Sequence, residues 1–537
     1  MDINTLYYGD NLKILREYIP DSSIDLIYLD PPFNSNATYN VLFKEPSGQA
    51  SQAQISAFGD TWHWGMESER ALQEIAASPI APAEVKEFMS VLPKLVGKRT
   101  DMAAYLTMMC ARLIELKRVL KDAGSLYLHC DPTASHYLKL IMDGVFGHQS
   151  FRNEIIWQRT NVHNAAGQYG RIHDTVLFYT RGISYTWNDL KLPYSEAQAK
   201  RYHKDASGRL YTGQDLTASR PDSDSGKFEW RGTMPPPSRG WGYTEEQLEK
   251  WWDEGRILTK RDGTPRMDGL KVYLDEMPGK PLQSIWTDVA RIANTSAERL
   301  GYPTQKPEAL LERIIKASSN DGDIVLDPFC GCGTAVVVAE KLKRRWIGID
   351  ITHLAIGLMK WRLKNIVPFP SFRVVGEPED LTGAIELAKQ DKYQFQWWAV
   401  HKIGGQPYGD KKKGADTGID GYLYYMDEKD RIKKAIISVK GGGVSVAMIR
   451  DLGHVIEREK ADIGVFITLE KPTRPMLEEA AMKGFYNSPL GRDYPRLQIL
   501  TVEEIIGGKT PEIPPWIAPI TAPAKPKKTK NKAARLL

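Results

Sequence analysis

The apolar and polar positions in the first part of the chain alternate between short buried runs and amphipathic stretches. Residues 23–33 form an apolar run interrupted by two prolines, which predicts a buried strand ending in a rigid loop. Residues 103–124 have the spacing of an amphipathic helix that Gly124 is expected to end. Strands are predicted to follow over 125–131, 153–160 and 173–181. Strands that alternate with helices indicate a mostly parallel sheet.

The same pattern returns after an irregular middle region. Residues 183–297 mix charges, glycine, proline and aromatic side chains without clear periodicity, which favours an inserted region with a recognition role. Beyond it, the α/β pattern predicts a helix, a strand, a second helix and a second strand over 309–319, 323–329, 334–343 and 345–350.

A third region has strands of its own, predicted over 421–426, 433–440 and 462–469. The last residues are rich in proline, alanine and lysine, and we expect them to be disordered. The predicted division of the chain is therefore 1–182, 183–297, 298–375, 376–510 and a basic tail over 511–537.

Composition adds few constraints. The 72 lysine and arginine residues against 67 acidic ones give a net charge of +5, which permits DNA binding without arguing for it. The four cysteines, Cys110, Cys130, Cys330 and Cys332, form neither a disulfide framework nor a CxxC pair, so a reducing compartment without structural zinc is expected. The chain has no apolar run of membrane-spanning length and does not begin like a signal peptide, so we expect a cytoplasmic protein.

A glycine-rich turn between a predicted strand and helix is the first candidate for chemistry. Gly331 and Gly333 permit positive backbone angles and close approach of a ligand. The amides at the start of the next helix favour a carboxylate, and Asp350 at the end of the next strand can accept hydrogen bonds from both hydroxyls of a ribose. This combination suits a nucleoside with an amino-acid tail.

Other meanings of a glycine-rich turn compete with this one. A dinucleotide fingerprint requires a third glycine where Val336 stands, and the turn is preceded by Asp327-Pro328-Phe329. A P-loop is excluded because no Gly-Lys-Ser/Thr follows. The turn therefore favours S-adenosylmethionine.

Asp30-Pro31-Pro32-Phe33 follows the first predicted strand and suits catalysis on an amine. An exocyclic amine is a poor nucleophile because its lone pair is delocalised into the ring. The Asp30 carboxylate and the Pro31 carbonyl can accept both amine hydrogens and free that lone pair, while the two prolines fix the carbonyl in place. Phe33 offers a face for stacking, and a base within duplex DNA would have to be flipped out. By itself, Asp-Pro-Pro is more often an ordinary surface turn, but a buried strand that ends in this motif, together with the glycine-rich turn, favours the catalytic interpretation.

At these residues the sequence resembles the prokaryotic amino-methylating DNA methyltransferases, specifically the circularly permuted beta class. In that class the catalytic motif comes first, the target-recognition region second and the cofactor motif last, as in this chain. The resemblance implies double-stranded DNA as substrate and a homodimer. It also implies a Rossmann-like S-adenosylmethionine-dependent sheet that holds the cofactor through Asp10, Gln305, Lys306, Asp327, Phe329, Gly331, Gly333, Thr334 and Asp350, with Pro307 beside them.

The resemblance also bears on the target base. Phe33 as the fourth residue of a catalytic motif that begins with Asp30 resembles adenine methylases more than cytosine-amine methylases. The chemistry alone leaves both bases open, because both amines present the same hydrogen bonds. Methylation at cytosine carbon is disfavoured because no cysteine lies next to a proline as a nucleophile.

The inserted region holds basic and aromatic residues that could contact DNA. The alternative is that Trp230, Trp241, Trp251 and Trp252 form a small core of the insertion itself. The candidate contacts are Arg201, Lys204, Arg220, Lys227, Trp230, Arg231, Arg239 and Trp241.

The third region suggests a hairpin that turns near residues 427–430. An antiparallel pair there would place Asp420 roughly opposite Val439 and Lys440, where a carboxylate and a lysine could hold Mg²⁺ and cleave DNA. This resembles the Mrr-type restriction-endonuclease fold, although Ser438 stands where glutamate or glutamine is expected. We therefore expect a second α/β, endonuclease-like domain, with a metal at Asp420 in doubt.

Three functions are consistent with these patterns. The chain could be a methyltransferase with an accessory nuclease-like domain, a combined endonuclease and methyltransferase, or a DNA-binding protein whose methylase fold is inactive. The complete motifs at Asp30–Phe33 and Gly331–Thr334 argue against the inactive protein.

Overall fold

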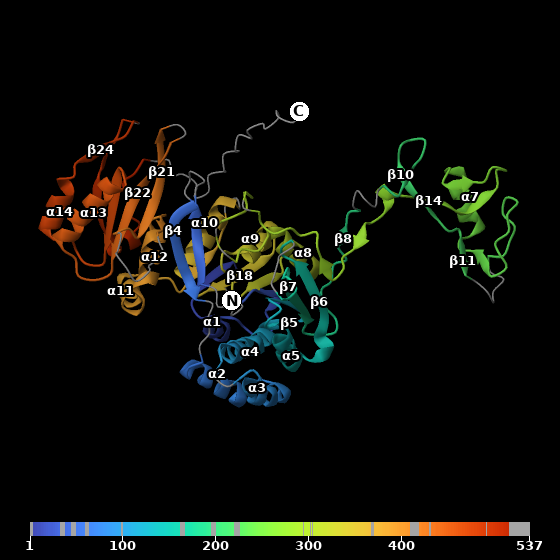
Figure 1. Ribbon diagram of the computed structural model, residues 1–537, viewed down its shortest axis with the longest axis horizontal. Helices are drawn as coiled ribbons and strands as arrows, with labels where there is room; N and C mark the ends of the chain where they lie inside the picture. The colour runs from blue at the N-terminus through green and yellow to red at the C-terminus, as the bar shows by residue number, and fades with distance from the viewer. Residues whose placement is uncertain are drawn as a thin grey trace. The chain divides into compact units, whose positions relative to one another are not determined.

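A nine-stranded, mostly parallel sheet organises the first unit of the chain (Figure 1). The computed structural model describes residues 4–32, 38–44, 50–59, 64–97, 100–161, 167–194, 200–219, 226–293, 295–300, 302, 304–366, 370–408, 418–428, 431–489 and 491–514. In spatial order the strands are β16 (Ile285–Trp286), β6 (Phe151–Gln158), β7 (His173–Thr180), β5 (Leu120–Cys130), β2 (Ile24–Leu29), β17 (Ile324–Asp327), β18 (Arg345–Asp350), β1 (Thr5–Tyr8) and β19 (Arg373–Val375). Only β7 runs antiparallel to its neighbours.

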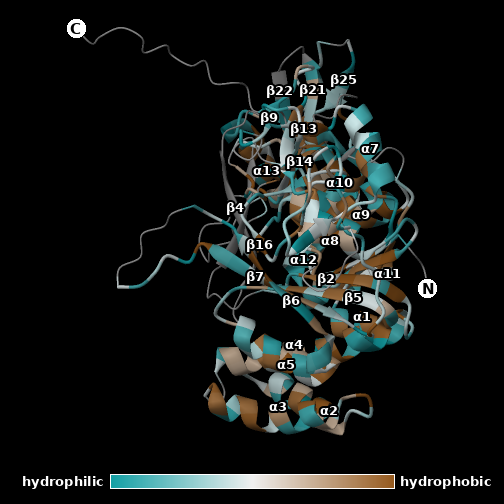
Figure 2. Cartoon of the chain, turned by 90° about the vertical axis from the view of Figure 1, so that its right-hand side faces the viewer, coloured by the Kyte–Doolittle hydropathy of each residue, from teal (hydrophilic) through white to brown (hydrophobic). Residues whose placement is uncertain are grey.

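Helices cover both faces of this sheet because its strands are apolar on both sides (Figure 2). On β2, Ile27 and Leu29 belong to one core, and Leu26 and Tyr28 to the other. The first core includes α1 (Asn11–Tyr18), α2 (Met66–Ala77), α3 (Ala83–Leu95), α4 (Asp101–Val119) and α5 (Ser135–Phe146), and the second includes α8 (Glu308–Ser318), α9 (Thr334–Lys341) and α10 (His353–Ile366). A hairpin of β3 (Thr38–Lys44) and β4 (Ala50–Gly59) and the short helix η1 (His148–Ser150) complete these elements.

The mixed α/β fold predicted from the sequence is confirmed, with one correction. Gly124 does not end a helix, because α4 ends at Val119 and β5 begins at the next residue. The side chain of Leu120 is fully buried and pairs in register with Ile24, which draws this segment into the sheet. A Cβ atom at position 124 would lie 2.6 Å from Leu120 Cδ1, so the glycine is needed for close packing within the strand.

Residues 189–283 form a separate small unit. Its core contains Trp230 and Trp241, with Trp251 and Trp252 packed against it. Its elements are β8 (Lys191–Leu192), β9 (His203–Lys204), β10 (Leu210–Gln214), β11 (Thr217–Ser219), β12 (Arg239–Trp241), α7 (Glu245–Asp253), β13 (Ile257–Thr259), β14 (Pro265–Tyr273), η2 (Leu274–Glu276) and β15 (Lys280–Pro281). The largest sheet has the order β13-β14-β10-β9 and is antiparallel.

The last part of the first unit contains a five-stranded sheet between two layers of helices. The spatial order is β20 (Gln406–Pro407), β21 (Gly421–Glu428), β22 (Arg431–Lys440), β23 (Ile463–Thr468) and β26 (Leu497–Thr501). Around it lie α11 (Leu381–Gln390), α12 (Lys392–Lys402), α13 (Val446–Arg458), α14 (Arg474–Ala481) and α15 (Val502–Ile506), with a hairpin of β24 (Phe485–Asn487) and β25 (Asp493–Pro495). The three strands predicted here are confirmed. Most of the predicted tail lies outside the described residues.

A search of the described residues found no helix with both the length and the apolar character needed to cross a membrane.

Candidate active site

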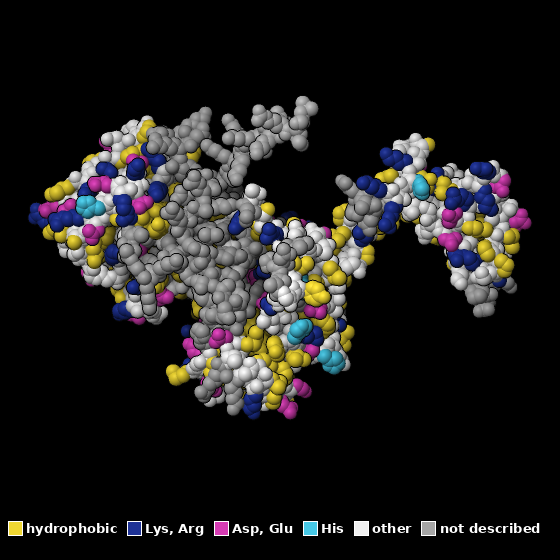
Figure 3. Space-filling view, viewed as in Figure 1, with side chains coloured by type: hydrophobic (Ala, Val, Ile, Leu, Met, Phe, Trp, Pro, Cys, Tyr) yellow, Lys and Arg dark blue, Asp and Glu magenta, His cyan; other side chains and the backbone are white. Residues whose placement is uncertain are grey.

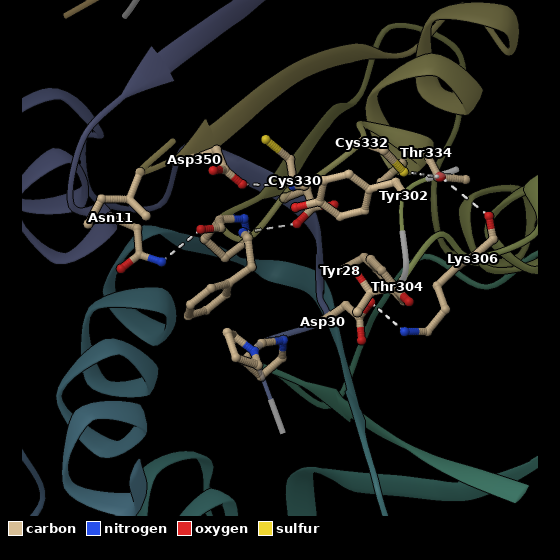
Figure 4. A pocket seen from close by; sticks show the side chains of 18 of the residues that line it. Asn11, Tyr28, Asp30, Tyr302, Thr304, Lys306, Cys330, Cys332, Thr334 and Asp350 are labelled. Atoms are coloured by element: carbon tan, nitrogen blue, oxygen red, sulfur yellow. Dashed lines mark hydrogen bonds and ion pairs between the residues drawn. The ribbon is translucent and has the colours of Figure 1, made fainter. Parts of the chain in front are cut away.

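Two loops that lie far apart in the chain meet at one edge of the nine-stranded sheet. Strand β2 pairs in parallel with β17, with Leu26 opposite Val325 and Ile27 opposite Leu326. Since both strands run in the same direction, the loops that follow them emerge together at the carboxyl edge. A pocket of about 270 Å³ lies there, between the Asp30 loop and residues 327–331 (Figure 4).

Most of the residues predicted to act at this site line that pocket. Phe33 lies outside the described residues. Gln305 and Gly333 are not part of the lining. Those that line it are Asp10, Asp30, Pro31, Pro32, Lys306, Asp327, Phe329, Gly331, Thr334 and Asp350.

The two oxygens of the Asp30 carboxylate have different surroundings. Oδ2 accepts a hydrogen bond from Lys306 Nζ at 2.5 Å, and both side chains are largely buried (Figure 4). Oδ1 is also buried and has no hydrogen-bond partner among the residues that the structure describes. A buried acceptor without a partner is costly, by about 1–3 kcal/mol, and marks a position where a bound donor would be stabilised.

Three carboxylates around the pocket make it suited to a positively charged ligand. Burial, reinforced by the nearby Asp30 and Asp350 carboxylates, raises the pKa of Asp327 well above its ordinary value, although the Phe329 amide hydrogen bond opposes this. Burial also raises the pKa of Asp350. A cation bound here would lower the free energy of all three ionised carboxylates.

The glycine-rich turn adopts the backbone that only glycine takes easily. Gly331 and Gly333 have φ angles of 48° and 74°. The Gly331 amide donates to Asp350 Oδ2 at 2.9 Å, and Asp350 Oδ1 accepts from the amide and hydroxyl of Thr352. These bonds hold the Asp350 carboxylate at the pocket wall, while Gly333 serves as the N-cap residue of α9.

Sequence reasoning missed a cluster beside Asp10. Arg112, on α4, donates to Asp10 Oδ2 and to Asn11 Oδ1, both at 2.5 Å. Asn11 in turn donates to the Pro328 carbonyl at 2.7 Å and so ties the start of α1 to the glycine-rich turn. Tyr28, Tyr302 and Thr304 line the pocket as well. No motif signals Arg112, because its position depends on how α4 packs against α1.

The expectation that Gln305 reaches the cofactor needs correction. Its side-chain amide is engaged elsewhere, accepting from the Leu300 amide at 2.8 Å and donating to the Glu298 carbonyl at 2.7 Å. The residue therefore shapes the loop before Lys306 and does not line the pocket. Gly333 also stands behind the pocket, where it packs closely against Met359.

Several arginines of the small unit form ion pairs within that unit. Arg231 pairs with Glu249 at 2.6 Å, and Arg239 pairs with Asp215 at 2.7 Å. Basic and acidic side chains accordingly interleave on its visible face (Figure 3). Arg220 lies outside the described residues, and Trp230 and Trp241 are buried in the core of the unit.

In the C-terminal sheet, Asp420 lies opposite Ser438, one residue from the predicted register. Gly421 pairs with Ile437, and a bulge after Met426 accounts for the shift. Asp420 Oδ2 accepts the Val439 amide at 2.7 Å, so its carboxylate is held by the neighbouring strand. No group of three or more histidine, cysteine, aspartate or glutamate residues suited to a metal was found where the structure describes the chain.

Comparison with known proteins identifies two families. Residues 24–359 match the family described as DNA methylase, and the chain belongs to this family. Residues 392–507 match a family described as NACHT-associated inactive restriction endonuclease 1. The predicted likeness to a restriction endonuclease is thereby confirmed, whereas the Mrr type and the magnesium ion considered at Asp420 find no support.

Several curated relatives are named as methyltransferases. The type II methyltransferase M.EcaI of Enterobacter cloacae is 35% identical over 250 residues, which are 46% of this chain and 55% of M.EcaI. The type III StyLTI Mod subunit of Salmonella typhimurium is 27% identical over 62% of this chain and 49% of that subunit. The chain thus spans about half the length of these two relatives. The DNA adenine methyltransferase YhdJ of Escherichia coli is 24% identical over 67% of this chain and 83% of YhdJ.

Proposed function

We propose that the chain transfers a methyl group from S-adenosylmethionine to the exocyclic amine of adenine in double-stranded DNA. The observation that carries this proposal is the buried Asp30 Oδ1, an acceptor without a partner among the described residues, facing the glycine-rich turn across one pocket. Membership of the DNA methylase family supports the reaction class. Phe33 in the motif and the likeness to the DNA adenine methyltransferase YhdJ favour adenine over cytosine.

The geometry at Asp30 explains how the amine would be activated. Lys306 donates to Oδ2 at 2.5 Å and thereby fixes the carboxylate in place. Oδ1 then accepts one amine hydrogen and the Pro31 carbonyl accepts the other. The amine nitrogen is drawn toward tetrahedral geometry, and its lone pair becomes available for attack. This is stabilisation by groups placed before the charge develops.

The residues around the pocket fit the proposed cofactor. Asp350, fixed by Gly331 and Thr352, is placed to accept the ribose hydroxyls, and Asp10, fixed by Arg112, to contact the adenine ring. S-adenosylmethionine would supply a methyl group on a positively charged sulfur, and the Asp30, Asp327 and Asp350 carboxylates favour that charge. The positive backbone angle at Gly331 keeps the turn close to the ligand.

DNA would be read mainly by the small unit formed by residues 189–283. Arg231 and Arg239 are paired with acids of the same unit, so exchange of those acids for phosphates or bases would accompany binding. The target base would have to leave the duplex to reach a pocket at the sheet edge, at a cost of a few kcal/mol.

The proposal is tested by label transfer from tritiated S-adenosylmethionine to unmethylated duplex DNA. Asp30→Asn is expected to lower the rate by about 10²–10³-fold, because it replaces a charged acceptor that acts in the transition state. Asp25→Asn is the matched control, since Asp25 lies on β2, the strand that Asp30 follows, and also pairs with a lysine, Lys121, but does not line the pocket. Its activity should stay within threefold of the wild type.

Two outcomes would contradict the proposal. Absence of label in any duplex would exclude the methyltransferase activity, and equal losses in Asp30→Asn and Asp25→Asn would exclude the role of Asp30. Digestion of the labelled DNA to nucleosides identifies the base: N6-methyladenine is expected, and N4-methylcytosine would overturn the choice of adenine.

A further inference from the structure

Three buried polar side chains form a hydrogen-bonded series that begins at the pocket wall. Tyr28 lines the pocket beside Asp30 (Figure 4). The Tyr28 hydroxyl lies 2.9 Å from His129 Nδ1. His129 Nε2 lies 3.2 Å from Asp174 Oδ2. Asp174 Oδ1 lies 3.6 Å from Nε of Arg159, whose side chain is half exposed. The first three residues are almost fully buried, so the series leads from the pocket to the surface.

The sheet explains why these residues meet. Tyr28, His129 and Asp174 belong to the adjacent strands β2, β5 and β7. On each strand they occupy the positions that alternate with residues of the first core, so all three face the second core. Because β7 is antiparallel to β5, Asp174 at its beginning lies near His129 at the end of β5. The series therefore crosses the sheet at the edge where Asp30 lies.

The charge on Asp174 determines which nitrogen of His129 carries the hydrogen. Burial alone would raise the pKa of Asp174, but the hydrogen bond from His129, together with the charges of Lys306 and Arg159, holds that pKa below its ordinary value. An ionised Asp174 can only accept, so His129 carries its hydrogen on Nε2. Nδ1 is then an acceptor and takes the hydroxyl hydrogen of Tyr28. The lone pairs of the Tyr28 oxygen remain for a donor in the pocket.

We propose that Tyr28, His129 and Asp174 form a relay that removes the proton which the substrate amine loses on methylation, an inference that rests on the proposed function. The amine nitrogen bonds the methyl carbon while the carbon–sulfur bond breaks, with its electron pair staying on sulfur. The nitrogen then carries two hydrogens and a positive charge. One of these hydrogens turns from the Pro31 carbonyl to the Tyr28 oxygen and passes to it as a proton, while the hydroxyl proton of Tyr28 passes to His129 Nδ1. The products are a neutral, methylated exocyclic amine on the base and a His129 imidazolium beside the Asp174 carboxylate.

The alternative proton acceptor, Asp30 itself, is less favourable. Protonation of Asp30 would cancel the charge that pairs with Lys306 at 2.5 Å and leave a largely buried ammonium beside a neutral acid. Protonation of His129 instead creates an ion pair with Asp174, which is already in place. The relay thus leaves the Asp30–Lys306 pair intact, and the half-exposed Arg159 beside Asp174 marks the end of the series that is nearest to solvent.

A matched set of variants separates proton transfer from a purely structural role. Tyr28→Phe removes the hydroxyl and keeps the ring, and Asp174→Asn keeps a hydrogen-bonding group but removes the charge that sets the imidazole hydrogen. Tyr127→Phe is the control, because Tyr127 lies opposite Tyr28 in the register, is equally buried and bonds Ser318 at 2.7 Å. The pocket lining does not include it. Single-turnover transfer of labelled methyl is measured from pH 6 to 9 on PCR-amplified genomic DNA, with enzyme in excess.

The expected result is a fall of about 10²-fold in the rates of Tyr28→Phe and Asp174→Asn, as is typical for loss of a proton-transfer group. S-adenosylmethionine affinity should stay within threefold, and Tyr127→Phe should keep its rate. The rate of Tyr28→Phe should also rise more steeply with pH than that of the wild type, because hydroxide replaces the relay. Rates of Tyr28→Phe and Asp174→Asn within threefold of the wild type, or an equal loss in Tyr127→Phe, would overturn the relay while leaving the methyltransferase proposal standing. An inactive wild type would overturn both.

Discussion

The glycine-rich turn offers a quantitative test of how tightly the cofactor wall is packed. Gly333 has a φ angle of 74°, and a Cβ atom there would lie 2.5 Å from Met359 Cγ and 3.0 Å from its sulfur. Met359 is fully buried in the second core, and protein cores are closely packed. Gly333→Ala therefore introduces both backbone strain and a collision at the N-terminus of α9.

The two terms can be separated. A left-handed backbone at alanine costs about 1–2 kcal/mol, and forcing an extra methyl group into a packed core costs about 1–3 kcal/mol. The lower entropy of the unfolded alanine chain offsets about 0.4–1 kcal/mol of this. We expect Gly333→Ala to lower the free energy of unfolding by about 2–4 kcal/mol. Gly322→Ala isolates the strain, since Gly322 has a φ of 84° but no atom within 4 Å of its added Cβ, and it should lose only about 1 kcal/mol.

Equilibrium urea denaturation followed by tryptophan fluorescence measures both variants, and titration calorimetry measures their affinity for S-adenosylmethionine. Gly333→Ala should also bind the cofactor more weakly, because the shifted turn carries Gly331 and Thr334, whereas Gly322→Ala should bind normally. Equal destabilisation of the two variants would refute the reasoning. It would mean that the Met359 side chain moves aside with no loss of stability and that only the backbone angle determines the effect.

Two further predictions concern the same pocket. Arg112→Met should weaken S-adenosylmethionine binding by about tenfold or more in calorimetry, because Asp10 and Asn11 lose the guanidinium that holds them, while Arg16→Met, whose guanidinium pairs with Glu74 and Glu115 instead, should bind normally. Binding of S-adenosylmethionine should also release a proton from Asp327. Burial raises the pKa of Asp327, so without the ligand its carboxyl stays protonated at pH values above the ordinary pKa of about 4. A cationic ligand favours the ionised carboxylate and therefore the loss of this proton. Affinity should therefore rise with pH, and proton release, measured by calorimetry in buffers of different ionisation enthalpy, should disappear in Asp327→Asn; release unchanged in that variant would assign the proton elsewhere.

The sequence predicted those parts of the site in which the motif residues directly follow a recognisable strand. An apolar run ending in Asp-Pro-Pro and another ending in Asp-Pro-Phe-Cys-Gly both signal strands that finish in loops. The rule that parallel strands end at one edge then predicts a shared pocket, as the pairing of Val325 with Leu26 shows. The mixed α/β fold followed from the same alternation of helices and strands.

The remaining features depend on packing between segments that are distant in the chain, and the pattern of apolar and polar residues does not reveal this packing. Gly124 looks like a helix stop locally, but the burial of Leu120 against β2 decides the local structure. Arg112 and His129 act on the pocket only because α4 and β5 place them against Asp10 and Tyr28. Gln305 occupies a position of the motif expected to bind the cofactor, but hydrogen bonds to the backbone of Glu298 and Leu300 determine where its side-chain amide points.

The proposed role of the small unit in reading DNA gives its connection to the rest of the chain a practical consequence. Its first and last strands, β8 and β15, pair with each other, so both ends of the inserted segment lie side by side. Just before it, Asn188 is anchored to the carbonyls of Lys316 and Ser319. A recognition domain from another protein could therefore replace this segment. The two junctions would lie next to each other at the β8–β15 pair, and the residues around Asp30 would stay unchanged.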